Sequence, residues 1–147
     1  VLSPLIILWF GHKTMSKVII SSISSFFPVL VNLMHGMIFV KIEYLELMKS
    51  LGASKKNIFF HLRLPNSLPY FFTGVKIAST MAVLGAVVGE FVGADKGLGY
   101  IMVLSSAYLE TPKLFAAIIM SSLIGIILFY IVSIIEKRTI LWEKDNL

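Results

Sequence analysis

The stretch Glu43–Pro65, EYLELMKSLGASKKNIFFHLRLP, is a polar interruption in an otherwise apolar chain, and it decides the fold. Its first part places apolar residues at the i, i+3, i+4, i+7 spacing of one helix face: Tyr44, Leu47, Met48 and Leu51. Gly52 predicts the end of this helix, because glycine enters the left-handed backbone conformation without a steric cost. The sequence therefore predicts a short amphipathic helix followed by a glycine elbow.

A second short helix is expected after the elbow. Ser54 predicts its N-cap, because a serine hydroxyl can accept a hydrogen bond from the free amides of a first helical turn. Leu64-Pro65 predicts its end, because proline has no amide hydrogen and restricts the preceding residue. A helix pair of this kind has the form of a plug for a groove on a partner. An ordinary helical loop is the alternative, and the pattern alone favours neither.

Within this stretch, Glu46, Gly52-Ala53 and Leu62-Arg63-Leu64-Pro65 resemble the EAA loop of ABC importer permeases. The family pattern is roughly E-A-A, three residues, G-A, a spacer and I-x-L-P. Leu47-Met48 stand where the family has two alanines, and Leu62 stands where it has isoleucine. These replacements are apolar, so the docking face survives.

The flanking sequence resembles a narrower branch, the permeases of the nitrate, taurine and alkanesulfonate type. The stretches that carry this likeness occur in the order of that branch: PLIILWFG (4–11), FFPV (26–29), SLGAS (50–54), TGV (73–75) and GLGY (97–100). The resemblance covers nearly the whole chain. It implies an all-α integral membrane fold, a type I ABC importer permease-like helical bundle, of which this chain is the C-terminal part.

Composition independently indicates a membrane protein. Hydrophobic residues make up 57% of the 147 residues and charged residues 14%, against about a quarter charged in soluble domains. The absence of cysteine excludes disulfides and thiolate metal sites. The net charge of +5 comes from basic residues beside apolar segments, which is typical of cytoplasmic loops and lipid headgroups rather than of nucleic-acid binding.

Hydropathy predicts three membrane spans, because about 20 helical residues cross the hydrocarbon: 18–40, 70–92 and 114–135. Residues 1–10 are expected to be the outer end of a truncated span, with Trp9 at the interface. The loop 41–69 carries five lysines and arginines and the C-terminal tail carries three. The positive-inside rule therefore places both in the cytoplasm, with the loop 93–113 outside. The resemblance implies that the membrane is a bacterial inner membrane.

A few polar residues fall inside or near these spans. Asn32 and His35 share one face, and are interpreted either as translocation-pathway residues or as packing contacts. Glu90 is interpreted either as a further translocation-pathway residue, acting in gating from an outer vestibule, or as an interfacial residue paired with Lys96. Lys76 is expected to extend to the headgroups.

Other span residues point to packing. Pro28 predicts a kink in the first span. A face of small residues in the second span predicts close approach of another helix: Gly74, Ala78, Ser79, Ala82, Gly85, Ala86 and Gly89. No metal site is expected, because His12, His35 and His61 are spread over both sides of the predicted topology.

The resemblance implies a function for the loop. A separate ATPase subunit would receive it in a groove and bind the ATP, so no cofactor is expected on this chain. Glu46 would hold the docking helix by capping an amide or pairing with a cation. Gly52 would form the elbow, Ala53 would permit close approach, and Leu64-Pro65 would fix the exit into the next span, with Leu47, Met48 and Leu62 as apolar docking residues.

Further partners follow from the resemblance: a second permease copy as a homodimer, an extracytoplasmic substrate-binding protein, and membrane lipid, but no nucleic acid. The implied substrate is a small anion such as nitrate, taurine or an alkanesulfonate, with a thiamine-precursor pyrimidine as the alternative. A membrane scaffold without transport activity is a competing class. A membrane enzyme is disfavoured, because the spans lack convergent acid, base or nucleophilic groups, and paired broken helices of a secondary transporter are not visible.

Overall fold

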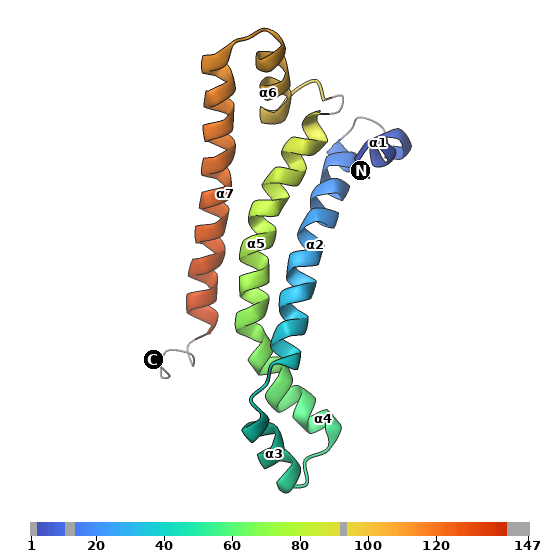
Figure 1. Ribbon diagram of the computed structural model, residues 1–147, viewed down its shortest axis with the longest axis vertical. Helices are drawn as coiled ribbons and strands as arrows, with labels where there is room; N and C mark the ends of the chain where they lie inside the picture. The colour runs from blue at the N-terminus through green and yellow to red at the C-terminus, as the bar shows by residue number, and fades with distance from the viewer. Residues whose placement is uncertain (1–2, 11–13, 92–93, 141–147) are drawn as a thin grey trace.

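All regular secondary structure in the described part of the chain is helical, as Figure 1 shows for this computed structural model. The structure describes residues 3–10, 14–91 and 94–140. The helices, in chain order, are α1 (Ser3–Phe10), α2 (Thr14–Ile38), α3 (Ile42–Ser50), α4 (Lys55–Ile58), the π-helix η1 (Phe59–Arg63), α5 (Leu64–Phe91), α6 (Leu98–Ala107) and α7 (Thr111–Thr139). The all-α membrane fold predicted from the sequence is confirmed.

Three long helices, α2, α5 and α7, run side by side (Figure 1). The described residues contain three helical segments long and apolar enough to cross a membrane: Met15–Ile38, Lys55–Phe91 and Thr111–Thr139. The short helices α1 and α6 lie at one end of this bundle, and the α3–α4 pair projects from the opposite end. His12 and Gly93, which entered the sequence interpretation, lie outside the described residues.

The pairing of α2 with α5 depends on small residues. A Cβ added to Gly74 would lie 2.9 Å from the Val29 Cα, and one added to Gly36 would lie 2.7 Å from the Ser67 Cα. The helices therefore touch backbone to backbone, which confirms the small-residue face expected on α5. Ser25 Oγ adds a hydrogen bond between the two helices, donating to the Ala78 carbonyl at 3.1 Å.

The expected helix end at Leu64-Pro65 is wrong. α4, η1 and α5 follow one another without a break, so one helical segment of 37 residues runs from Lys55 to Phe91. At the π-helix the Leu64 amide donates to the Phe59 carbonyl, five residues back. Such a widened turn makes room for the ring of Pro65, which would clash with the carbonyl four residues earlier in a regular α-helix. The helix also continues through Pro69, where the second span was expected only from Tyr70.

The end of α2 is held by a side chain of α5. Asn66 Nδ2 donates to the Gly36 carbonyl at 2.7 Å and to the Phe39 carbonyl at 3.3 Å. The Gly36 carbonyl is one of the last of α2 and the Phe39 carbonyl follows the helix end at Ile38, and carbonyls at a helix end lack an amide partner inside the helix. Residues 39–41, which join α2 to α3, are not helical.

Candidate functional site

The elbow between α3 and α4 has the geometry that a glycine permits. Gly52 has φ +70°, in the left-handed region. Its amide donates to the Lys49 carbonyl at 2.9 Å, and the Ala53 amide donates to the Met48 carbonyl at 3.0 Å. These two bonds make a Schellman motif, which satisfies the last carbonyls of α3. A Cβ at Gly52 would meet nothing within 4 Å, so the requirement for glycine comes from the backbone conformation alone.

The second helix of the pair begins as its sequence predicts. The Ser54 hydroxyl accepts a hydrogen bond from the Asn57 amide at 3.3 Å, and Ser54 is in the extended conformation of an N-cap residue. α4 itself is only four residues long, but it continues into η1 and α5. The elbow is therefore fixed by a C-cap on one side and an N-cap on the other.

The apolar face of α3 is mostly exposed. Tyr44 is 52% exposed, Leu47 58% and Leu51 74%, while Met48 is half-buried. Exposed large apolar side chains grouped on one face are typical of a surface that binds a partner. Ala53, Leu62 and Pro65, the other apolar positions of the loop pattern, are half-buried, and Leu64 is 37% exposed.

Glu46 is exposed on α3, and its carboxylate forms no hydrogen bond or ion pair within the described residues. Its backbone carbonyl accepts from Ser50 Oγ at 2.9 Å. Of the two roles expected for Glu46, capping an amide of the loop is not observed here. A cation on a partner is left as the candidate contact.

Glu90 lies at the opposite end of the bundle, where it joins three segments. Its Oε1 is 3.2 Å from Lys17 Nζ of α2, and its Oε2 accepts from the Gly99 amide of α6 at 2.8 Å. Lys17 Nζ also reaches the Lys96 carbonyl at 3.4 Å. The expected pairing of Glu90 with the Lys96 ammonium is therefore wrong. Antiparallel packing puts the first turns of α2 beside the last turn of α5, so Lys17 takes that place.

Two glycines make room for this carboxylate. Gly97 precedes α6 with φ +129°, and a Cβ there would overlap the carboxylate of Glu90. A Cβ at Gly99 would lie 2.5 Å from the Val87 carbonyl oxygen. The backbone at Gly97 and Gly99 can therefore approach the end of α5 closely only because these two residues have no side chain.

The structure does not bring Asn32 and His35 to Glu90. Asn32 lies near Gly74 on the α2–α5 contact, and its Nδ2 donates to the Pro28 carbonyl of its own helix at 2.8 Å. His35 is exposed, with its ring 5.1 Å from that of Phe39. The two residues thus belong to the part of α2 near the α3–α4 pair, while Glu90 belongs to the α6 end.

An ion pair between α5 and α7 was not predicted. Lys76 Nζ lies 2.5 Å from Glu136 Oε2, and the two side chains are only 19% and 18% exposed. The same ammonium lies 6.0 Å from the centre of the Phe129 ring. The Lys76 ammonium thus has a carboxylate partner on α7, and its expected extension to the headgroups stays a prediction.

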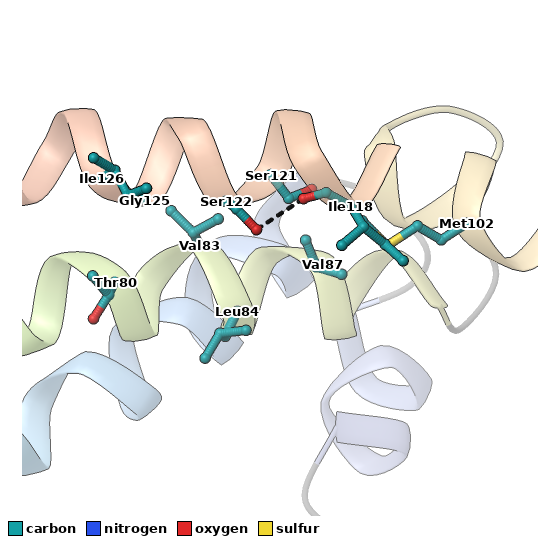
Figure 2. A pocket seen from close by; sticks show the side chains of 10 residues that line it. All are labelled: Thr80, Val83, Leu84, Val87, Met102, Ile118, Ser121, Ser122, Gly125 and Ile126. Atoms are coloured by element: carbon teal, nitrogen blue, oxygen red, sulfur yellow. Dashed lines mark hydrogen bonds between the residues drawn. The ribbon is translucent and has the colours of Figure 1, made fainter. Parts of the chain in front are cut away.

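A hollow of about 400 Å³ lies between α5 and α7 and is also lined by Met102 of α6. Figure 2 shows its lining side chains. The hydroxyls that line it bond to their own helices: Thr80 to the Ile77 carbonyl, Ser121 to Ala117 and Ser122 to Ile118. The hydroxyl hydrogens of the lining are therefore used within their own helices, and the lining is otherwise apolar. Among the residues that the structure describes, no group of three or more acidic or histidine side chains is placed to hold a metal ion.

Comparisons with known proteins agree with this architecture. Residues 1–141 match the family described as binding-protein-dependent transport system inner membrane component. The formylaminopyrimidine transport permease protein ThiX of Halalkalibacterium halodurans is 39% identical over 145 residues, which are 99% of this chain and 58% of that protein. The riboflavin transport system permease protein RibX of Chloroflexus aurantiacus is 33% identical, over 97% of this chain and 53% of that protein.

A third relative comes from the narrower branch of nitrate, taurine and alkanesulfonate permeases. The putative aliphatic sulfonates transport permease protein SsuC of Bacillus subtilis is 30% identical, over 97% of this chain and 52% of that protein. The chain thus spans somewhat more than half the length of these relatives. Because the family match covers nearly the whole chain, this all-α membrane chain belongs to the binding-protein-dependent transport inner membrane component family, the ABC importer permeases.

Proposed function

We propose that this chain is the ATPase-coupling part of an importer permease, and that the α3–α4 pair is its coupling element. The observation that carries the proposal is the exposed apolar face of α3, set beside an elbow fixed by caps on both sides. An exposed helix face of this kind fits a groove on a second protein. The five lysines and arginines of the loop 41–69 favour the cytoplasmic side, where a separate ATPase subunit would meet it.

Transport would follow from movement of this pair. ATP binding closes two ATPase subunits and moves their grooves, and the docked helices move with them. α4 is continuous with α5, and α5 packs closely on α2, so a displacement of α4 would shift the whole α2–α5 pair. Two alternative packings of the bundle, biased by ATP on another subunit, would then expose the pathway to each side in turn.

The other parts of the proposal follow from the family. ATP would bind to the partner subunit, since this chain has no phosphate-binding loop. A second permease copy would complete the pathway and an extracytoplasmic binding protein would deliver the solute. Asn32 and His35 stay candidates for the pathway, while Glu90, held by Lys17 and Gly99, is better suited to positioning α6.

The proposed substrate is a small solute. The relatives that carry the likeness are named for formylaminopyrimidine, riboflavin and aliphatic sulfonates. A small anion such as taurine, nitrate or an alkanesulfonate and a thiamine-precursor pyrimidine are therefore the two classes to test first. Uptake into vesicles that contain the reconstituted transporter, measured with one labelled member of each class, distinguishes them.

A pair of glycine substitutions tests the coupling role. Gly52 and Gly125 both have open space for a Cβ, but only Gly52 has a positive φ. Gly52→Val should therefore distort the elbow, whereas Gly125→Ala in α7 should not. We expect Gly52→Val to insert normally but to lose transport-coupled ATP hydrolysis in reconstituted transporter, with Gly125→Ala close to the wild type. Normal coupling in Gly52→Val would refute the elbow argument, and ATPase capture without uptake of any solute would favour the scaffold.

A further inference from the structure

A hollow lies between α3 and the α4–η1 segment, on the inner side of the elbow. Its volume is about 310 Å³. Its lining combines three apolar side chains with three cationic ones: Leu45, Ile58 and Phe59, and Lys49, Lys55 and Arg63. Lys49 belongs to α3 and Lys55 to α4, so the cations surround the hollow from both sides of the elbow.

These three cations are without an acidic partner in the described part of the chain. The ion pairs found there are Lys17–Glu90, Lys76–Glu136 and Lys113–Glu110, and none involves the hollow. Several like charges around one concave, partly apolar site concentrate a positive potential there. The hollow is therefore complementary to an anionic group carried on an apolar stem.

The position of the hollow favours a protein over a membrane surface. The Lys76–Glu136 pair marks where the end of α7 lies along α5, and α7 ends at Thr139. Leu64, the first residue of α5 after η1, is about 18 Å of helix from Lys76 at 1.5 Å per residue, and the hollow lies beyond Leu64. The headgroup layer of each leaflet is only about 5 to 8 Å thick. The α3–α4 pair thus projects well past the end of α7 (Figure 1).

We propose that this hollow accepts an aspartate or glutamate side chain from the surface of the ATPase subunit. The proposal rests on the function proposed above, and adds to it an electrostatic contact separate from the apolar face of α3. The Arg63 guanidinium can bind a carboxylate with two parallel hydrogen bonds, and Lys49 and Lys55 add charge from either side. A carboxylate bound there bridges α3 and α4, so the partner holds both helices of the elbow and moves them as one unit.

Zero-length crosslinking tests this contact directly. A carbodiimide joins an amine to a carboxylate only when the two touch. The experiment uses the intact permease in detergent with its purified ATPase subunit, and identifies linked residues by mass spectrometry. We expect links from Lys49 or Lys55 to an acidic residue of the ATPase. Lys56 is the internal control, because it is exposed on the same helix but does not line the hollow. Links from Lys56 alone, or none in a complex that a spacer crosslinker shows to be assembled, would overturn the proposal.

A matched pair of charge reversals gives the affinity. Lys55→Glu should weaken binding of the purified ATPase by about tenfold or more and flatten its dependence on salt, because like charges then meet in the contact. Lys56→Glu makes the same change one residue away and should stay within about twofold, as rim charges do. Both variants are checked for helical content.

The outcomes separate this proposal from the one on which it rests. Equal effects of the two substitutions, with firm binding of the wild type, overturn the hollow as acceptor and leave the coupling function standing. Failure of the wild type to bind the ATPase overturns both. A Lys55→Glu effect on binding to phosphatidylglycerol vesicles, with ATPase binding unchanged, assigns the hollow to lipid and overturns the proposal.

Discussion

The Lys76–Glu136 pair makes a sharp prediction about how the third long helix is held. At 2.5 Å between Nζ and Oε2, the Coulomb attraction is about 7 kcal/mol with an effective dielectric constant of about 20. Desolvation of two charges offsets most of that gain, so the net value of such a pair is small. Removing one partner has a larger effect, because it leaves the other charge unpaired in a mostly apolar setting.

We therefore expect Lys76→Met to lower the free energy of unfolding by about 2 kcal/mol, below the 3–5 kcal/mol of a fully buried pair because each side chain is about a fifth exposed. Glu136→Gln should have a similar effect. The double variant should lose less than the sum of the two, with a coupling energy of about 1 to 2 kcal/mol. Unfolding by titration with a denaturing detergent, followed by circular dichroism, gives these values.

The chain contains its own control for this measurement. Lys113 and Glu110 also form an ion pair, with Nζ–Oε2 at 2.8 Å, but their side chains are 67% and 44% exposed. Lys113→Met should therefore lower the free energy of unfolding by less than about 0.5 kcal/mol. If Lys76→Met is no more destabilising than Lys113→Met, or the coupling energy is near zero, the argument that this pair fixes α7 against α5 fails.

Three further predictions concern the packing of the bundle. Gly97→Ala should separate α6 from the end of α5, because a Cβ there overlaps the Glu90 carboxylate. Proteolysis within residues 94–97 should then become faster. An unchanged rate of proteolysis would contradict the contact. Gly36→Leu should destabilise the α2–α5 pair by about 2 kcal/mol or more, since the backbone of Ser67 occupies the space. Unfolding in a denaturing detergent measures this loss, with the conservative substitution Leu33→Met as the control. Asn66→Ala should cost about 1 kcal/mol, because it frees the carbonyls of Gly36 and Phe39, and faster amide exchange near the end of α2 should accompany it.

Local features of the fold could be predicted from the sequence. The caps at Gly52 and Ser54 depend on the backbone conformation of a few adjacent residues, and the structure has both as expected. The long apolar helices follow from hydropathy, because the bilayer sets their length. The rule that proline ends a helix failed at Leu64-Pro65. The π-helix before Pro65 makes room for the proline ring, and nothing in the residues themselves signals the wider turn.

Contacts between distant segments could not be predicted. Lys17 and Glu90 are 73 positions apart, and their pairing depends on the register of α2 against α5. That register is set by glycines that permit backbone contact at several levels, not by the charged residues themselves. The partners of Lys76 and Asn66 were missed for the same reason. The hollow beside Lys55 likewise exists only once the elbow has brought α3 and α4 together.

The two connections of the α3–α4 pair to the bundle differ in kind. Residues 39–41 enter the pair without helical structure, whereas the exit through η1 into α5 is helical throughout. One residue inserted into a continuous helix turns everything before it by about 100° and shifts it by about 1.5 Å. An added residue between η1 and Tyr70 would thus aim the elbow away from its partner, while the same addition at 39–41 would only lengthen a tether. The direction in which the docking surface faces therefore depends on the number of residues in the helical connection through η1. It does not depend on the length of the non-helical connection at 39–41.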